Sequence, residues 1–278
     1  MFDSGVGGLT VLHELLVALP NEDFLYLGDK ARFPYGVRPP EELERFSLEI
    51  ADRLLGAGAK LLVVACNAAT SSALPALQRH LMETTLPVDV VGVVQPESVL
   101  AVAATSNGRI GLLATPTTVA TGAYARAVTA ADPLVRLESV ACPDLAPLIQ
   151  GGFPFDASVV DTVRGYCQPL IEAGVDTVIL GCTHYPLVAP MIQRALGRGV
   201  TLIPSGSAVA RRVEHALASR GLENPRAGEG DYRFPCTGDV DAFREVGTRF
   251  LQMPLGDVEH VEVAGATPVG EATPGAAA

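Results

Sequence analysis

The sequence lacks both a long hydrophobic run and a cluster of basic residues. No apolar stretch approaches the roughly 18 residues that suggest a membrane-spanning helix, so we expect no membrane association. The 20 Lys and Arg residues are outnumbered by 31 Asp and Glu residues, which gives a formal net charge of −11. Because a chain of this charge repels the phosphate backbone, we also expect no general binding of nucleic acid.

The first residues lack the features of a secretory signal peptide. Met-Phe-Asp-Ser-Gly contains neither a basic region nor an apolar core. We therefore expect a cytoplasmic protein.

Cysteine is scarce, and its five residues do not form a recognisable framework. The count is odd and the spacing is too wide for a disulfide scaffold or a zinc knuckle. We expect reduced thiols, most of them packed as small hydrophobic residues. The five are Cys66, Cys142, Cys167, Cys182 and Cys236.

What the sequence does contain is an alternation of two kinds of segment. Short Val- and Leu-rich runs alternate with stretches rich in Ala, Leu, Glu and Arg, which indicates an α/β fold. The length of 278 residues suits one large domain or two ordinary ones. The low-complexity residues 264–278 are expected to be disordered. The expected strands are 24–27, 61–65, 88–94, 109–113, 137–140, 177–181, 201–203, 232–237 and 258–263. The expected helices are 9–19, 41–56, 68–81, 96–105, 118–130, 155–174, 187–196, 205–220 and 239–250.

Two of the cysteines occupy equivalent places in this pattern. Leu-Leu-Val-Val-Ala precedes Cys66, and Thr-Val-Ile-Leu-Gly precedes Cys182. Each cysteine thus follows a buried strand, where sites of open α/β sheets lie, and a helix is expected soon after it. A helix N-terminus favours negative charge and lowers a thiol pKa from its usual value of about 8.5. The pattern suggests two similar lobes that face each other with reactive thiols, although two core cysteines remain an alternative.

Five segments in order resemble motifs of the glutamate racemase family. They span nearly the whole chain, from about residue 2 to residue 255. The segments are 2–11 (Phe-Asp-Ser-Gly-Val-Gly-Gly-Leu-Thr-Val), 28–36 (Gly-Asp-Lys-Ala-Arg-Phe-Pro-Tyr-Gly), 65–67 (Ala-Cys-Asn), 181–187 (Gly-Cys-Thr-His-Tyr-Pro-Leu) and 237–245, which opens with Thr-Gly-Asp.

The resemblance implies two pseudo-symmetric α/β lobes with mostly parallel sheets and an active-site cleft between them. Residues 1–92 with 205–257 would form the first lobe and 93–204 the second, followed by a terminal strand and tail at 258–278. The implied activity is the interconversion of L- and D-glutamate, which supplies D-glutamate for peptidoglycan. No cofactor and no metal are expected, and a homodimer is the family expectation.

Racemisation needs a base on one face of the α-carbon and an acid on the other. By the resemblance, Cys66 takes the proton from D-glutamate and Cys182 takes it from L-glutamate. Asp3 assists Cys66, and His184 assists Cys182. From the residues alone, Asp3 is equally a turn carboxylate, and His184 a core histidine or half of a stray metal pair.

Substrate binding is expected from small polar side chains and from backbone N–H groups after each cysteine. Such groups at helix N-termini hold carboxylate oxygens and stabilise the charge that develops as the α-proton leaves. The positions that match the family's substrate-binding residues are Asp3, Ser4, Tyr35, Gly36, Asn67, Ala68, Thr183 and His184.

Several residues depart from the family pattern. Ala68 stands where Thr or Ser is usual, and Thr70 is the nearest hydroxyl that can replace the lost one. Usual glutamates are replaced by Gln95 and Gln150, and a usual Thr by Lys30. These changes remove no proposed acid or base, but we expect shifted thiol pKa values and lower turnover.

The segment before Asp3 is also short. Only Met1 and Phe2 precede it, where family members generally have several apolar residues of a first strand. Either the true start lies upstream or the first strand is stunted, and a weak first strand would hold Asp3 loosely.

Three other functions fit parts of the sequence. A sister racemase would act on aspartate, but Thr-His-Tyr-Pro after Cys182 is characteristic of the glutamate branch. A Cys-His hydrolase would use Cys182 as its nucleophile and leave Cys66 without a role. A non-catalytic binding protein, for example one that restrains DNA gyrase, would not need both thiols.

Overall fold

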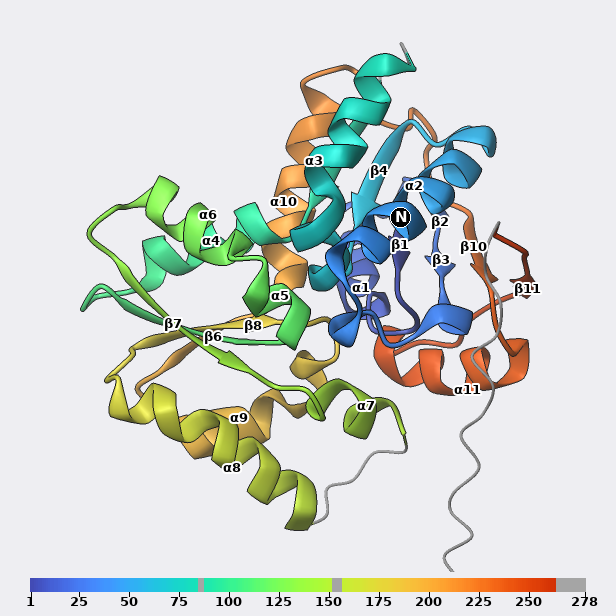
Figure 1. Ribbon diagram of the computed structural model, residues 1–278. Helices are drawn as coiled ribbons and strands as arrows, with labels where there is room; N and C mark the ends of the chain where they lie inside the picture. Colours follow the sequence, from blue (N-terminus) through green and yellow to red (C-terminus); the bar gives the residue numbers. More distant parts are fainter. Residues whose placement is uncertain (85–87, 152–156, 264–278) are drawn as a thin grey trace, which may run out of the picture.

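The computed structural model describes residues 1–84, 88–151 and 157–263. These residues form two α/β lobes, each built on a parallel sheet (Figure 1). The strands are β1 (Phe2–Asp3), β2 (Phe24–Leu25), β3 (Leu27–Gly28), β4 (Leu61–Val64), β5 (Asp89–Gly92), β6 (Arg109–Ala114), β7 (Arg136–Ala141), β8 (Thr177–Gly181), β9 (Thr201–Ile203), β10 (Tyr232–Cys236) and β11 (Val258–His260). The α-helices are α1 (Leu9–Ala18), α2 (Pro40–Gly56), α3 (Asn67–Glu83), α4 (Val94–Ala104), α5 (Pro116–Ala120), α6 (Ala123–Ala131), α7 (Leu145–Gln150), α8 (Ala157–Glu172), α9 (Ala189–Leu196), α10 (Ser205–Ala218) and α11 (Val240–Leu251). Short 3₁₀ helices are η1 (Lys30–Arg32), η2 (Tyr35–Val37) and η3 (Tyr185–Val188).

The first sheet places the chain's first strand in its interior. Its order is β11-β10-β3-β1-β4-β5, with β2 also paired to β10, and all of these pairs are parallel. The chain therefore returns after α10 to complete the sheet on which it began, and the last described strand extends this sheet at its edge.

The second sheet has the order β7-β6-β8-β9 and is also parallel. Every residue of β8 is buried, as expected for a strand covered on both faces. Helices α8 and α9 pack together, as do α4 and α6. Helix α10 contacts both α1 and α4 and so ties the lobes together (Figure 1). The α/β class with two lobes, predicted from the alternating segments and the resemblance, is confirmed.

Most expected elements are present, and the differences have local causes. The single helix expected over 118–130 is two helices, α5 and α6, because Gly122 takes a left-handed conformation with φ of 65°. The strand expected over 24–27 is split because the N–H of Tyr26 bonds to β10 while the N–H of Leu27 bonds to Met1. Helix α7 was not predicted. The expected tail and the expected start of the 155–174 helix lie outside the described residues.

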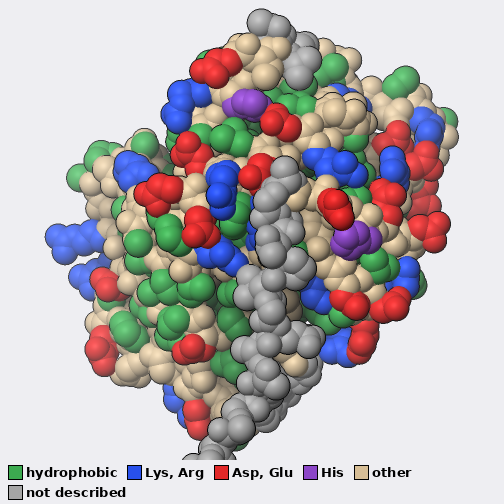
Figure 2. Space-filling view, turned by 45° about the vertical axis from the view of Figure 1, so that its right-hand side comes forward, with side chains coloured by type: hydrophobic (Ala, Val, Ile, Leu, Met, Phe, Trp, Pro, Cys, Tyr) green, Lys and Arg blue, Asp and Glu red, His purple; other side chains and the backbone are tan. Residues whose placement is uncertain are grey.

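The surface mixes charges of both signs. Figure 2 shows acidic and basic side chains interspersed over one face. None of the described helices combines the length and the apolar character that crossing a membrane requires. Among the described residues, no group of three or more His, Cys, Asp or Glu side chains is placed to hold a metal ion.

Candidate active site

A cavity between the lobes collects almost all of the predicted site residues. The first lobe contributes Ser4 directly after β1, residues of η2 and the start of α3, and the second lobe contributes Thr115, part of α7 and the residues from the end of β8 onward. The cavity measures about 30 Å³, room for about two water molecules. It is therefore closed around a space much smaller than an amino acid. The predicted residues that line it are Ser4, Tyr35, Gly36, Cys66, Asn67, Ala68, Cys182, Thr183 and His184.

Cys66 occupies the place that its sequence pattern predicts. Strand β4 ends two residues before it, and α3 begins at Asn67, so Cys66 is the N-cap residue of α3. The backbone N–H of Ala69 donates to its Sγ at 3.5 Å. The Cys66 sulfur therefore lies at the positive end of a 17-residue helix.

Cys182 also follows a buried strand, but no α-helix begins directly after it. Its backbone oxygen accepts from the N–H of Tyr185 in a tight turn, η3 follows, and α9 begins only at Ala189. Pro190 has no N–H to bond the carbonyl of Pro186, which prevents one continuous helix from forming here. The expected symmetry thus holds for the strand ends and not for the helix starts.

Burial decides the protonation of both thiols. It raises the pKa of Cys66 to about 12, and the nearby Asp3 carboxylate raises it further. Burial likewise raises the pKa of Cys182 well above its usual range. The expectation of lowered thiol pKa values is therefore wrong for this closed cavity, because removal from water outweighs the helix N-terminus.

His184 is oriented by a residue that the sequence marks as unusual. Its Nε2 lies 2.9 Å from Oε1 of Gln150, and a carbonyl oxygen only accepts, so Nε2 carries the proton. The free lone pair of Nδ1 then faces Sγ of Cys182 at 3.8 Å. Because burial lowers the pKa of His184 to about 3, the imidazole is neutral, and its Nδ1 is placed to accept a hydrogen bond from the Cys182 thiol.

Asp3 lies beside the cavity, firmly held and fully buried. The N–H of Gly5 donates to its Oδ2 at 3.1 Å, and the hydroxyl of Thr183, from the other lobe, donates to its Oδ1 at 3.4 Å. Burial raises the pKa of Asp3 to about 6. The expectation of a loosely held Asp3 is wrong, because β1, although only two residues long, bonds to strands on both sides.

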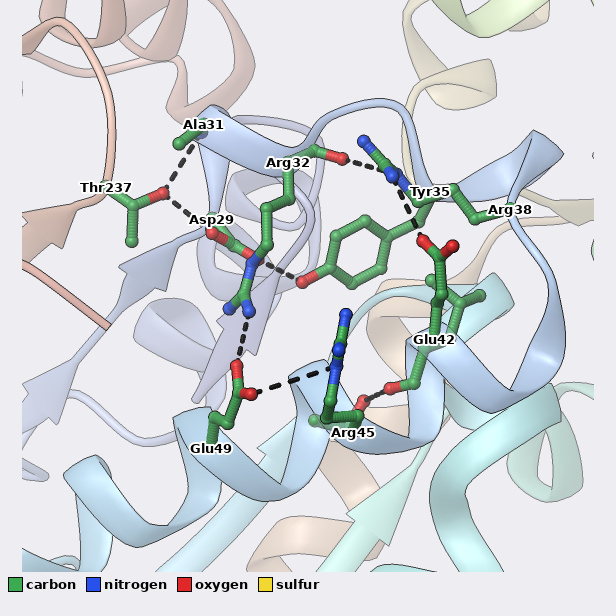
Figure 3. A network of polar contacts seen from close by, with 11 residues as sticks. Asp29, Ala31, Arg32, Tyr35, Arg38, Glu42, Arg45, Glu49 and Thr237 are labelled. Carbon is green, nitrogen blue, oxygen red and sulfur yellow. Dashed lines mark hydrogen bonds and ion pairs between the residues drawn. The ribbon is translucent and has the colours of Figure 1, made fainter. Parts of the chain in front are cut away.

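Tyr35 points its hydroxyl toward Asp29 in a network of polar contacts (Figure 3). Its hydroxyl donates to Asp29, which also accepts from Nε of Arg32 at 2.5 Å and from the hydroxyl of Thr237 at 2.7 Å. Arg32 continues the network to Glu49 on α2. The network fixes the loop from Asp29 to Tyr35 within the first lobe, so Tyr35 offers the cavity its ring and backbone. The sequence analysis did not single out Asp29.

The residues that the sequence analysis identified as departures, and Thr70 as a possible replacement, lie in different surroundings. The hydroxyl of Thr70 donates to the carbonyl of Val64 at 2.9 Å, so it does not replace the hydroxyl missing at Ala68. Gln95 is exposed, away from the cavity, whereas Glu97 two residues later is fully buried. The expected effect of Gln95 on the thiols therefore has no structural basis.

The second lobe adds a residue that the sequence analysis missed. Thr115, at the end of β6, lines the cavity opposite Gly36. A Cβ at Gly36 would lie 2.5 Å from Cβ of Thr115. Only the register of β6 beside β8 shows that this threonine reaches the cleft, since nothing in its local sequence marks it.

Comparison with known proteins agrees with this geometry. The family model for Asp/Glu/hydantoin racemases matches residues 9–213. A glutamate racemase of Geobacter metallireducens is 44% identical over 263 residues, which cover 95% of this chain and 96% of that protein. A crystal structure of a glutamate racemase from Bacillus anthracis superposes with a TM-score of 0.88 at 36% identity, over 94% of this chain and 96% of that one. A glutamate racemase of Francisella tularensis, solved with D-glutamate, has a TM-score of 0.86 at 30% identity, over 94% and 95% of the two chains.

Proposed function

This chain belongs to the Asp/Glu/hydantoin racemase family, and we propose that it is a glutamate racemase that uses two thiols and no cofactor. The observation that carries the proposal is the meeting of Cys66 and Cys182, one from each lobe, on a single closed cavity. A Cys-His hydrolase has no use for the first of these thiols, and the named relatives are racemases.

The reaction removes one proton from the α-carbon of glutamate and adds one proton to the opposite face of the same carbon. In the L-to-D direction, the Cys182 thiolate removes the α-proton of L-glutamate, and the Cys66 thiol gives its proton to the opposite face of the α-carbon. D-glutamate leaves with Cys182 protonated and Cys66 as the thiolate. Exchange of these protons with water or with the auxiliary groups restores the starting state, and the reverse direction exchanges the two roles.

Each thiol has a partner that can take its proton. Neutral His184 presents Nδ1 to Cys182, and Asp3, with its raised pKa of about 6, lies near Cys66. Because burial disfavours both thiolates, a positive charge must accompany them. The α-ammonium group of the substrate supplies that charge when it enters the cavity.

Backbone N–H groups would hold the carboxylate next to the reacting carbon. Asn67 and Ala68, the first residues of α3, line the cavity, and the first N–H groups of a helix have no carbonyl partner within it. They stabilise the negative charge that moves onto the carboxylate as the α-proton leaves. Supply of D-glutamate for peptidoglycan, a cytoplasmic location and a homodimer complete the proposal.

Isotope exchange tests the activity directly. The protein is incubated with L-glutamate in heavy water without added cofactor, and the α-proton signal and the optical rotation are followed. We expect loss of the α-proton together with decay of the rotation to zero. Neither change at any pH between 6 and 9 would refute the racemase, and turnover of aspartate alone would reassign the substrate.

Single cysteine variants test the two-thiol mechanism. Cys66→Ala and Cys182→Ala should each lower racemisation by at least about 10³-fold, since each removes an obligatory acid or base. Cys167→Ala is the matched control, because Cys167 is also fully buried but lies on α8 outside the cavity. Near-normal activity in either active-site variant would overturn the mechanism.

A further inference from the structure

A buried polar cluster lies beside the cavity and is not part of the chemistry described above. It consists of Asn67 at the start of α3, Glu97 on α4 and Tyr124 on α6, and we call it the Glu97 cluster. The three side chains are at most 3% exposed. Nδ2 of Asn67 donates to the Tyr124 hydroxyl at 2.7 Å and lies 3.3 and 3.4 Å from the two Glu97 oxygens. The Tyr124 hydroxyl in turn donates to Glu97.

The cluster determines which way the Asn67 amide points. When Glu97 is ionised, both of its oxygens only accept hydrogen bonds, so the Asn67 amide turns its NH₂ group toward them. The amide oxygen Oδ1 is then left buried and, within the described part of the chain, without a hydrogen-bond partner. Buried acceptors are rarely left unpaired. Asn67 also lines the cavity, whereas Glu97 and Tyr124 do not.

Oδ1 of Asn67 is an unpaired acceptor on a residue that lines the cavity. We therefore expect a bound ligand to supply the missing hydrogen-bond donor. An α-amino acid carries one such cationic donor, its ammonium group, and a hydrogen bond from a charged group is among the strong ones. Burial raises the pKa of Glu97 to about 8, and hydrogen bonds from Ser205 at the start of α10, from Tyr124 and from Asn67 oppose that rise. An ammonium group at Asn67 would add a nearby positive charge, which favours the ionised carboxylate and so strengthens the same arrangement.

We propose that Glu97, together with Tyr124, is a positioning residue that holds the Asn67 oxygen toward the cavity to receive the ammonium group of the substrate. This inference rests on the proposed function for its ligand, an acidic amino acid. It assigns Glu97 no contact with the substrate and no proton transfer. The carboxylate acts only through the Asn67 amide.

Glu97→Gln tests this role with little change of shape. One end of the introduced amide is a donor, which favours an Asn67 amide turned with its oxygen toward that donor and its NH₂ group toward the substrate ammonium. We expect the dissociation constant of D-glutamate and the KM for both enantiomers to rise about 10- to 100-fold, the loss typical of a hydrogen bond to a charged group. We expect kcat to change less than about threefold, because a contact made equally in ground and transition states alters KM alone.

A double-mutant cycle separates positioning from a purely structural role. Asn67→Ala removes the group through which Glu97 is proposed to act, so Glu97→Gln in that background should leave D-glutamate binding, measured by calorimetry, within about twofold. Equal losses in the two backgrounds would overturn the proposal. Gln95→Glu is the control, since Gln95 is exposed on the same helix and should bind as the wild type does.

Two further outcomes are informative. Tyr124→Phe keeps the Asn67–Glu97 contact and should weaken D-glutamate binding less than Glu97→Gln does. If Tyr124→Phe lost as much affinity as Glu97→Gln while its melting temperature stayed unchanged, the proposal that Glu97 orients Asn67 would be contradicted. A wild type that binds D-glutamate without racemising it would refute the proposed function alone, because the binding cycle still decides the role of Glu97.

Discussion

At the scale of single residues, the site depends on neutral groups placed against reactive ones. Gln150 bonds Nε2 of His184, and burial keeps the imidazole uncharged, so Nδ1 accepts rather than donates toward Cys182. The sequence marks position 150 as a departure, but its partner lies 34 residues away and only the fold brings the two together.

Restoring the acid at this position should change the pH dependence in one direction. In Gln150→Glu a carboxylate would face His184 Nε2, raise the pKa of His184 and stabilise an imidazolium beside the Cys182 thiolate. The thiolate would then form at lower pH. We expect the rising limb of the kcat/KM profile for L-glutamate to move by about 1 to 3 pH units toward acid.

Profiles of kcat/KM against pH, measured with both enantiomers, check the predicted shift. Gln168→Glu, at an exposed position on α8, is the control for an added charge in the same lobe. A shift toward alkaline pH in Gln150→Glu would contradict the assigned orientation of His184.

At the scale of elements, the closed cleft depends on η2 and α5 meeting across the lobes. The hydroxyl of Thr117 donates to the carbonyl of Arg38 at 2.8 Å, and Gly36 approaches Thr115 without room for a side chain. Since the cavity measures only about 30 Å³, we expect these elements to separate for entry of glutamate and to meet again around it.

Gly36→Ala should prevent this closure. The added Cβ would lie 2.5 Å from Thr115 Cβ, so the lobes would stop short of the closed position. Misplacement by about 1 Å costs roughly 100-fold in rate, and we expect a similar fall in kcat/KM. Gly56→Ala, where no atom lies within 4 Å of the new Cβ, should leave steady-state kinetics unchanged. Full activity of Gly36→Ala would show that this contact does not limit closure.

At the scale of the whole molecule, buried acids make the stability of the fold depend on pH. Glu97 has a pKa of about 8 in the folded protein against an ordinary value of 4.5. Between these values the folded state binds more protons than the unfolded state, so the free energy of unfolding falls as pH rises. Each pH unit in that range costs up to about 1.4 kcal/mol.

Glu97→Gln should remove this slope, because it has no proton to lose. Urea unfolding of wild type and variant at pH 5.5 and pH 8.0 measures it. We expect the wild type to lose stability relative to Glu97→Gln between the two values. A parallel response of the two proteins would show that Glu97 keeps an ordinary pKa.

The sequence by itself determined the α/β class, the two strand ends that carry Cys66 and Cys182, and most element boundaries. These follow from short-range patterns, namely buried apolar runs, helix caps and turn residues. Tertiary structure decided that the thiols share one closed cavity, that burial raises their pKa values, and that Glu97 and Thr115 stand beside them. Such features arise from contacts between segments far apart in the chain and from the exclusion of water where those segments meet. A local sequence pattern encodes neither the long-range contacts nor the exclusion of water.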